Sequence, residues 1–387
     1  MSTTSNISWV TSLDPNRTAW ANHSERGNAS KVLEPCSNTS LYFTATWDTF
    51  TSATPVLILT AFALGLVLNL AVLLVYALHH GAQTVADVYV TNLTVAELLL
   101  VVNLPFWATA VKQGLNWPFG DFMCRATNAV LYVNKYASVF FLTAVSLDQH
   151  QVICKTMQSH AKRRVSRVRL RCVALWLCSL LLGLPVVIFR NVRPLPENDL
   201  PAVCFLDYPS PAWNVVNRIL LDVLGFVLPF TTIGVCGFRI RRSLLRSRVS
   251  TRSGGELVAS GARDQERSRA IVAISTVVVG FFVCWFPFHF NSCCGWLLKT
   301  DVLADKCWWE LLWNLCSQIS TYFGFLNSCV NPALYFTASR AFQRKALQVL
   351  RCRRDQASNS SSIASKSRSR AEHASVGHTS SQASSSM

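Results

Sequence analysis

Three charged side chains stand alone inside long apolar stretches of the sequence: Glu97, Lys135 and Asp222. A charge in such surroundings is costly unless it meets a polar partner or a ligand. Asn69 and Asn331 are further polar residues in apolar stretches, and we expect both to meet Glu97 in the protein interior. The alternative for Glu97 and for Asp222 is a hydrogen-bonded core carboxyl group without a role of its own.

The sequence contains no arrangement of residues that is typical of catalysis or of metal binding. It has no nucleophile and base in a known constellation, no glycine-rich phosphate loop and no cysteine pairs at zinc spacing. We therefore expect a protein that is not an enzyme and that has neither a metal site nor a cofactor.

Seven windows almost free of charge are each long enough to cross a membrane, which takes about 20 apolar residues in a helix. The windows are Val56–Leu78, Val88–Val111, Ala126–Ser146, Cys172–Phe189, Ile219–Phe238, Ala270–Leu298 and Leu311–Ala338. Only 14% of the residues are charged, against roughly 25% in soluble domains. The predicted fold class is all-α integral membrane, a seven-transmembrane helix bundle over residues 54–338.

Basic residues lie mainly in alternate connections between the windows. Nine arginines follow the fifth window and a basic run, 155–169, follows the third, whereas connections 112–123, 190–218 and 299–310 together hold six Lys and Arg. The positive-inside rule then places the N-terminus outside and the C-terminus in the cytoplasm. The net charge of +16 is therefore not a sign of nucleic-acid binding, since the arginines flank membrane windows and no binding module is present.

Residues 1–53 are polar and are predicted to form an extracellular glycosylated tail. They contain five Asn-X-Ser/Thr sequons, which are glycosylated only in the secretory lumen. The sequons are at Asn6, Asn16, Asn22, Asn28 and Asn38. No apolar signal-peptide core is found there, so we expect the first membrane helix to serve as the insertion signal.

Four of the 14 cysteines fall in segments predicted to be extracellular: Cys36, Cys124, Cys204 and Cys307. An even number in an oxidising compartment indicates two disulfides, for which the sequence allows three connectivities. A Cys124–Cys204 bond would tie the second outer loop over the bundle mouth. A Cys36–Cys307 bond would tie the N-terminal tail to the third outer loop, and this pairing is our working hypothesis.

The C-terminal part is predicted to leave the membrane and lie on it. Residues 339–352 have apolar side chains at helical spacing with cations between them, which is typical of an amphipathic helix on the inner leaflet. Cys352 follows as a candidate for palmitoylation. Residues 353–387 form a predicted disordered, serine-rich cytoplasmic tail, which would be a kinase substrate or an inert linker.

Each window also carries a marker that resembles class A, rhodopsin-like G-protein-coupled receptors. The markers are Gly65-Leu-Val-Leu-Asn69, Asn92-Leu-Thr-Val-Ala-Glu97, Asn116-Trp-Pro-Phe-Gly120 with Cys124, Trp176, Pro229, Cys284-Trp285-Phe286-Pro287 and Asn327-Ser-Cys-Val-Asn331-Pro332-Ala-Leu-Tyr335. Each is weak alone, but their order, one per window, is specific, and the resemblance covers about residues 50–355.

The resemblance implies which residues switch the receptor between states. The family uses a tryptophan before a kinking proline, here Trp285 and Pro287, to turn ligand binding into helix movement. Pro332 with Tyr335 would form a second kink near the cytoplasmic end. Glu97 stands where the family usually has an aspartate that binds a sodium ion, and its longer side chain leaves that ion an open question.

A closer resemblance is to the kinin (bradykinin) receptors. It rests on Leu104-Pro-Phe-Trp107, Asn116-Trp-Pro-Phe-Gly120-Asp-Phe-Met-Cys-Arg125, Phe189-Arg190, Leu220-Leu-Asp-Val-Leu-Gly-Phe-Val-Leu-Pro229, Lys155-Thr-Met157 and Asn327-Ser-Cys-Val-Asn-Pro332. Angiotensin-type receptors share many of these features, and chemokine receptors share the two-disulfide arrangement, so both remain alternatives.

The third window ends in Asp148, Gln149 and His150, where the family has Asp-Arg-Tyr. In the family that arginine latches the inactive state and then contacts the G protein, and Gln149 carries no charge with which to do either. A non-signalling receptor that scavenges peptide is therefore the alternative to a signalling one. A transporter or channel is a third class, but the internal repeats that it predicts are not found.

The resemblance implies a peptide site at the outer bundle mouth. Kinin receptors place acids there for the arginine of the peptide, but our alignment puts Gly295 and Asn314 at those positions. Asp222 and nearby acids are the candidate replacements, and Arg190 would meet a peptide carboxylate unless it is only an interfacial residue. The full candidate ligand-binding set is Trp107, Trp117, Arg190, Asp222, Phe290, Asp301, Glu310 and Asn314.

The function that follows is a receptor for an extracellular, kinin-like peptide at the plasma membrane. The resemblance implies coupling to a heterotrimeric G protein of the Gq type, with arrestin and receptor kinases acting on the serine-rich tail. The expected mechanism is a ligand-driven shift between two bundle arrangements.

Overall fold

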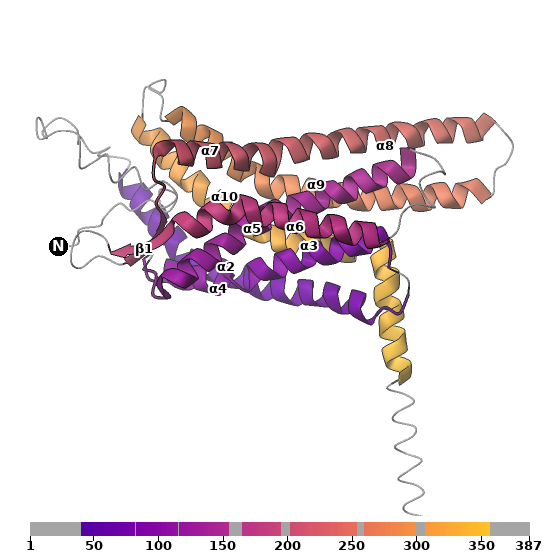
Figure 1. Cartoon of the computed structure of the whole chain (residues 1–387), viewed down its shortest axis with the longest axis horizontal. Helices are drawn as coiled ribbons and strands as arrows, with labels where there is room; N and C mark the ends of the chain where they lie inside the picture. The colour runs from indigo at the N-terminus through magenta and orange to yellow at the C-terminus, as the bar shows by residue number, and fades with distance from the viewer. Residues whose placement is uncertain are drawn as a thin grey trace, which may run out of the picture.

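The computed structural model describes residues 40–81, 83–114, 116–154, 165–194, 202–253, 259–298 and 306–356. Within these ranges the chain is largely helical, and long helices run side by side along one direction (Figure 1). The helices are α2 (Ser40–Leu78), α3 (Val85–Val101), α4 (Leu104–Lys112), α5 (Gly120–Cys154), α6 (Val165–Phe189), α7 (Pro211–Asp222), η3 (Val223–Val227), α8 (Leu228–Ser253), α9 (Ala259–Leu298) and α10 (Lys306–Ala338).

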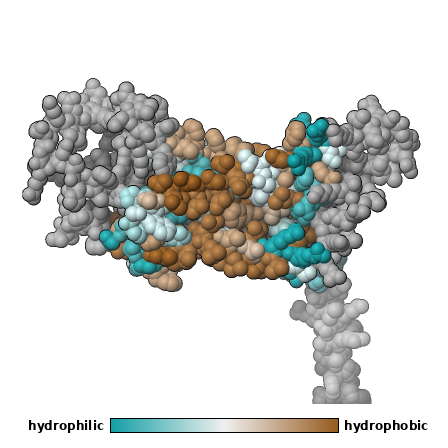
Figure 2. Space-filling view, turned by 45° about the horizontal axis from the view of Figure 1, so that its top comes forward, coloured by the Kyte–Doolittle hydropathy of each residue, from teal (hydrophilic) through white to brown (hydrophobic). Residues whose placement is uncertain are grey.

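These elements make seven passes, because α3 continues into α4 and α7 continues through η3 into α8. Among the described residues, six of the seven passes are long and apolar enough to cross a membrane. The remaining pass is α10, a helix of 33 residues. On the face shown in Figure 2, hydrophobic residues cover the middle of the helices and hydrophilic residues lie toward both ends. This distribution matches the apolar interior and polar surfaces of a bilayer.

The passes differ in how far they are buried within the protein. Only 22% of the apolar window of α6 is buried, against 56% of that of α5. Leucines of α6 such as Leu170 and Leu181 are exposed, although their side chains are apolar. The position of α5 is therefore central, and the outer face of α6 suits contact with lipid chains.

Prolines mark the places where helical hydrogen bonding changes. The α3–α4 pass is interrupted at Val102 and Asn103, and Pro105 stands in the first turn of α4. A single wide turn, η3, precedes Pro229. Pro287 and Pro332 lie inside α9 and α10, where a missing N–H weakens the helix locally and favours bending.

A two-stranded hairpin covers one end of the bundle. β1 (Arg190–Pro194) pairs antiparallel with β2 (Ala202–Leu206), with Val192 opposite Cys204. Since Cys204 is bonded to Cys124 at the start of α5, we call this end the disulfide end. The opposite end is where α10 finishes.

The helical boundaries extend beyond those expected from sequence. α2 already begins at Ser40, before residue 54, and runs through Pro55, which a helix tolerates where neighbouring helices support it. Residues 340–356 form a helix that turns away from the common direction of the bundle helices (Figure 1). That direction fits a helix lying along the membrane surface, and it continues past residue 352, where the sequence pattern ended.

An ion pair fastens this last helix to the start of α3. Lys345 donates to Asp87, and both side chains are largely buried, at 14% and 10% exposure. Asp87 also accepts from the backbone N–H of Thr84, while the Thr84 hydroxyl accepts from the backbone N–H of Asp87. One carboxylate therefore caps α3 and holds the surface helix at once.

We expect Lys345→Ala to loosen the surface helix, since charge-assisted hydrogen bonds are worth about 1.5–3 kcal/mol. Backbone amide exchange in residues 340–356 should accelerate, while exchange in α5 stays unchanged. Arg351→Ala is the matched control, because Arg351 is exposed on the same helix. Equal exchange in the two variants would show that the ion pair does not anchor the helix.

Candidate functional site

A disulfide joins Cys124 of α5 to Cys204 of β2, with the two Cα atoms 5.7 Å apart. This half of the predicted pairing is confirmed. Cys36 lies outside the described residues, and the side chain of Cys307 does too, so the second bond stays a prediction. The sequons at Asn6, Asn16, Asn22, Asn28 and Asn38 likewise lie outside the described part of the chain.

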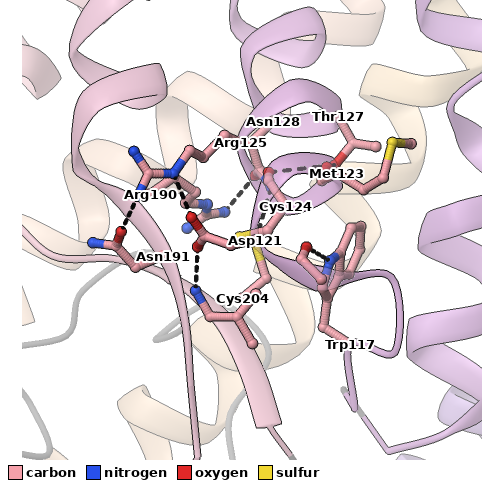
Figure 3. The surroundings of a disulfide bond; sticks show 12 residues. Trp117, Asp121, Met123, Cys124, Arg125, Thr127, Asn128, Arg190, Asn191 and Cys204 are labelled. Carbon is pink, nitrogen blue, oxygen red and sulfur yellow. Dashed lines mark hydrogen bonds and ion pairs between the residues drawn. A yellow bond between two sulfur atoms is a disulfide. The ribbon is translucent and has the colours of Figure 1, made fainter.

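Side-chain hydrogen bonds also hold the hairpin to α5 beside the disulfide (Figure 3). Asp121 accepts from the backbone N–H of Val192 at 3.0 Å, and the Arg190 guanidinium donates to Asn128 Oδ1. Arg190 is 2% exposed. Burial lowers the pKa of its guanidinium to about 10, which leaves it charged at neutral pH. Arg190 therefore connects β1 to α5 within the protein.

Two of the three aromatic residues expected at the bundle mouth, Trp107 and Trp117, pack together near the hairpin. Trp117 is 3% exposed and donates from Nε1 to the Gly120 carbonyl. Its ring lies 5.9 Å from that of Trp107 and 5.3 Å from that of Phe119, centroid to centroid. Trp117 thus packs in the core of the disulfide end, while Trp107 keeps partial exposure.

Asp222 is surrounded by donors from its own chain. Its Oδ1 is 2.7 Å from Nδ1 of His289, and its Oδ2 accepts from the Ser292 hydroxyl at 3.2 Å. Arg218, one turn earlier on α7, lies 3.9 Å from the same carboxylate. A cationic group of a ligand would therefore have to compete with partners already in place.

Lys135 of α5 points among aromatic rings of α9. Its ammonium nitrogen is 3.8 Å from the ring centroid of Phe288 and 5.3 Å from that of Trp285. Tyr132 lies one turn earlier at 5.4 Å. Such contacts attract a cation to the electron-rich ring faces, so Lys135 sits directly beside the expected switch tryptophan.

The other expected ligand residues are less informative. Phe290 is 57% exposed and its ring stacks on that of Phe286. Asp301 lies outside the described residues. Glu310 and Asn314 lie in α10, but their side chains are also outside the described set. Of these four residues only Phe290 has a described side chain, so the roles of the other three stay predictions.

Glu97 lies at the centre of a second polar cluster, deeper in the bundle, and is fully buried. Its carboxylate accepts hydrogen bonds at 2.7–3.3 Å from five side chains of α5 and α10. The donors are Asn134 Nδ2, Ser138 Oγ, Asn327 Nδ2, Ser328 Oγ and Asn331 Nδ2. The two oxygens of a carboxyl group offer at most about four lone-pair sites, so these five donors use its full capacity as an acceptor.

Asn69 joins this cluster indirectly. Its amide donates at 2.8 Å to the carbonyls of Gly65 and Ser328, and the Ser328 hydroxyl in turn donates to Glu97. The expected meeting of Asn69, Glu97 and Asn331 thus occurs, with Ser328 between the first two. α2, α3, α5 and α10 are linked through this one cluster.

The Glu97 cluster fits the sodium ion that the resemblance implies. The Oδ1 atoms of Asn134, Asn327 and Asn331 are buried and have no hydrogen-bond partner among the described residues. Carbonyl, hydroxyl and carboxylate oxygens are ligands that hard cations prefer. Glu97, with the Ser138 and Ser328 hydroxyls, would hold the ion, whose charge would neutralise the carboxylate.

The expected switch residues Trp285, Tyr335 and Asp148 are buried within the bundle. Trp285 is 3% exposed, and Gly324 of α10 packs against it, since a Cβ there would lie 3.6 Å from its ring. Tyr335 is buried, 6.5 Å from Phe342 of the surface helix between ring centroids. Asp148 is buried near the end of α5, with Gln149 and His150 half-buried beside it.

Comparison with known proteins decides the family. The family described as 7 transmembrane receptor (rhodopsin family) matches residues 68–335. The chain belongs to this receptor family. The B2 bradykinin receptor of Oryctolagus cuniculus is 35% identical over 75% of this chain and 77% of its own. The B1 bradykinin receptors of Mus musculus and Homo sapiens are 33% and 34% identical, over 79% and 78% of this chain and 91% and 83% of theirs.

Membership of the rhodopsin family confirms the predicted fold class, a seven-transmembrane helix bundle. It also shows that the chain is a receptor and not an enzyme. Together with the apolar helices it makes the chain a multi-pass protein of the plasma membrane. The described residues hold no cluster of three or more His, Cys, Asp or Glu that would bind a metal ion.

Two residues of this rhodopsin-family receptor were not assigned a role from sequence: His289 and Lys135. A signal for each was present. His289 follows Trp285 by four residues, so both share one face of α9. Lys135 follows Asn134 directly and is the single charge of its apolar window, which already called for a partner.

Proposed function

We propose that the chain is a receptor for an extracellular peptide of the kinin type and that it signals through a heterotrimeric G protein, of the Gq class. The relatives are bradykinin receptors by name. The observation that carries the proposal is the position of two consecutive residues of α5. Asn134 donates to Glu97, and Lys135 contacts the rings of Phe288 and Trp285.

Consecutive residues in a helix point about 100° apart, since a turn takes about 3.6 residues. One turn of α5 thus contacts both the Glu97 cluster and the rings of α9, and a ligand that shifts this turn would move both contacts. The two clusters respond as a unit, and the arrangement that binds the ligand better becomes more populated. Outward movement of α9 at the opposite end would then admit the G protein.

The proposed orientation has the disulfide end outside the cell. The sequons of residues 1–53 and the arginines of connections 155–169 and 239–269 support it. Trp107, Asp222 and His289 would then face the peptide. Residues 340–356 would lie on the inner leaflet with Cys352 exposed for palmitoylation, and the serine-rich tail would take receptor kinases and arrestin.

The test is a peptide screen on cells that express the full chain. We expect a short basic peptide of the kinin class to displace a labelled analogue and to release calcium from intracellular stores. Displaceable binding by none of the peptides would contradict the proposal. Binding without calcium release would favour the second candidate, a receptor that captures peptide without signalling.

Gln149 motivates that second candidate, because it replaces the arginine that the family uses at the G-protein interface. If wild type binds peptide silently, we expect Gln149→Arg to restore calcium release with unchanged peptide affinity, since the substitution lies far from the disulfide end. His150→Tyr is the matched control at the next position. A silent Gln149→Arg variant would show that the missing arginine is not what prevents signalling.

A further inference from the structure

The last turns of α9 pack against the first half of α10 at the disulfide end of the bundle. The Asn291 side chain donates to the Ser317 hydroxyl, and Nε1 of Trp313 donates to the Asn291 carbonyl at 2.9 Å. A Cβ atom on Gly295 would lie 2.9 Å from the same Nε1 atom of Trp313. Residues 291 and 295 of α9 therefore face residues 317 and 313 of α10, and the two helices run in opposite directions.

This register places one cysteine of each helix on the same side of the contact. Cys294 precedes Gly295 and Cys316 precedes Ser317, and a step of one residue turns a side chain by about 100° about the helix axis. Because the helices run in opposite directions, the two turns bring both cysteines to the same flank of the helix pair. Their thiol groups are close enough to interact electrostatically.

The preceding cysteine, Cys293, has a different environment. It interacts electrostatically with Asp222 and Arg218 of α7. A cysteine in an apolar helix commonly serves as a small buried residue, but Cys294 is only half-buried and Cys316 is exposed, and both are free thiols. Core packing therefore does not account for this pair.

We propose that Cys294 and Cys316 are a redox-sensitive pair, which an oxidant of the peroxide class joins by a disulfide between α9 and α10. The pair lies toward the same end as the Cys124–Cys204 bond, and disulfides form and persist in oxidising surroundings. Each thiol gives up its hydrogen and an S–S bond forms. The two electrons pass to hydrogen peroxide, which is reduced to two molecules of water. A small thiol would reverse the step by exchange.

The bond would restrain the part of α9 that follows Pro287. This proline lies inside the helix, and helices bend at such positions. A link at residue 294 would hold the segment after the proline against α10, while the longer segment before it could still move about the bend. The inference goes beyond the proposed peptide function and does not depend on which ligand the receptor binds.

The first experiment detects the bond itself. The purified full-length receptor in detergent is treated with hydrogen peroxide, its remaining thiols are blocked with N-ethylmaleimide, and its fragments are analysed by mass spectrometry. We expect a fragment that joins Cys294 to Cys316 in wild type and in Cys293→Ser, the matched control at the adjacent position. Absence of this link in wild type, a link from Cys293, or a link between the Cys316 residues of two chains would overturn the proposal.

The second experiment measures what the bond does. Peroxide should raise the unfolding temperature of wild type and Cys293→Ser by about 4–8 °C relative to Cys294→Ser and Cys316→Ser, since a new cross-link restricts the unfolded chain. The Cys124–Cys204 bond stays intact throughout, because no reductant is added. Equal responses of all four proteins would mean that the pair has no effect on stability and would contradict the proposal. Failure of the peptide screen would leave both measurements unaffected.

Discussion

Glu97→Leu should cost the receptor several kcal/mol of stability, because each buried donor left without an acceptor costs about 1–3 kcal/mol. Leucine nearly matches the volume of glutamate, so packing changes little. The effect comes from five donors of α5 and α10 that lose their common acceptor in a fully buried position. The measurement is the unfolding temperature of the purified protein, together with the fraction that reaches the cell surface.

Two milder substitutions in the Glu97 cluster should lower the stability by smaller amounts. Glu97→Gln keeps one acceptor oxygen and turns an NH2 group toward the donors, so we expect a loss of about 1–3 kcal/mol. Ser138→Ala removes a single neutral donor, for which about 1 kcal/mol is expected. If Glu97→Leu were as stable as Ser138→Ala, the carboxylate would not be the centre of the network.

Loss of the Cys124–Cys204 bond should cost a similar amount. The bond closes a loop with a sequence separation of 80, for which chain-entropy arguments give about 4.5 kcal/mol. We expect Cys204→Ser to lower the unfolding temperature and to reduce ligand affinity, because the hairpin would lose its covalent tie above α5. The experiment compares both variants of the pair, Cys204→Ser and Cys124→Ser, with and without reductant.

The control is Cys178→Ser, at an exposed free cysteine of α6. Its unfolding temperature should equal that of wild type. Reductant should bring wild type down to the level of Cys204→Ser and should not affect the latter further. A wild type that is indifferent to reductant and to the substitution would mean that hydrogen bonds alone fix the hairpin.

The sequence predicted the features that depend on which segment of the chain, membrane-spanning or outer, a residue belongs to. Apolar windows of sufficient length predicted the membrane passes, because lipid leaves a backbone few other structures. The outer cysteines predicted two disulfides in one of three connectivities, and the structure shows that Cys124 pairs with Cys204. The meeting of Glu97 and Asn331 followed from the cost of polar groups at bilayer depth.

Features that depend on how each helix is rotated about its axis could not be predicted in the same way. The sequence did not predict the contact of Asp222 with His289 of α9, a residue 67 positions away. Nor did it predict that the turn into β1 brings Arg190 to Asn128 of α5. Such contacts are set by the packing of neighbouring passes, which sequence spacing within one helix does not reveal.

The hairpin at the disulfide end has a kinetic consequence. A sulfur–sulfur bond from Cys204, a carboxylate from Asp121 and a guanidinium from Arg190 fasten its two strands to α5. A segment so secured forms a fixed rim, and a ligand need not wait for it to open. Association should then proceed at the ordinary encounter-limited pace of about 10⁵–10⁷ M⁻¹ s⁻¹, with residence time, not entry, distinguishing one ligand from another.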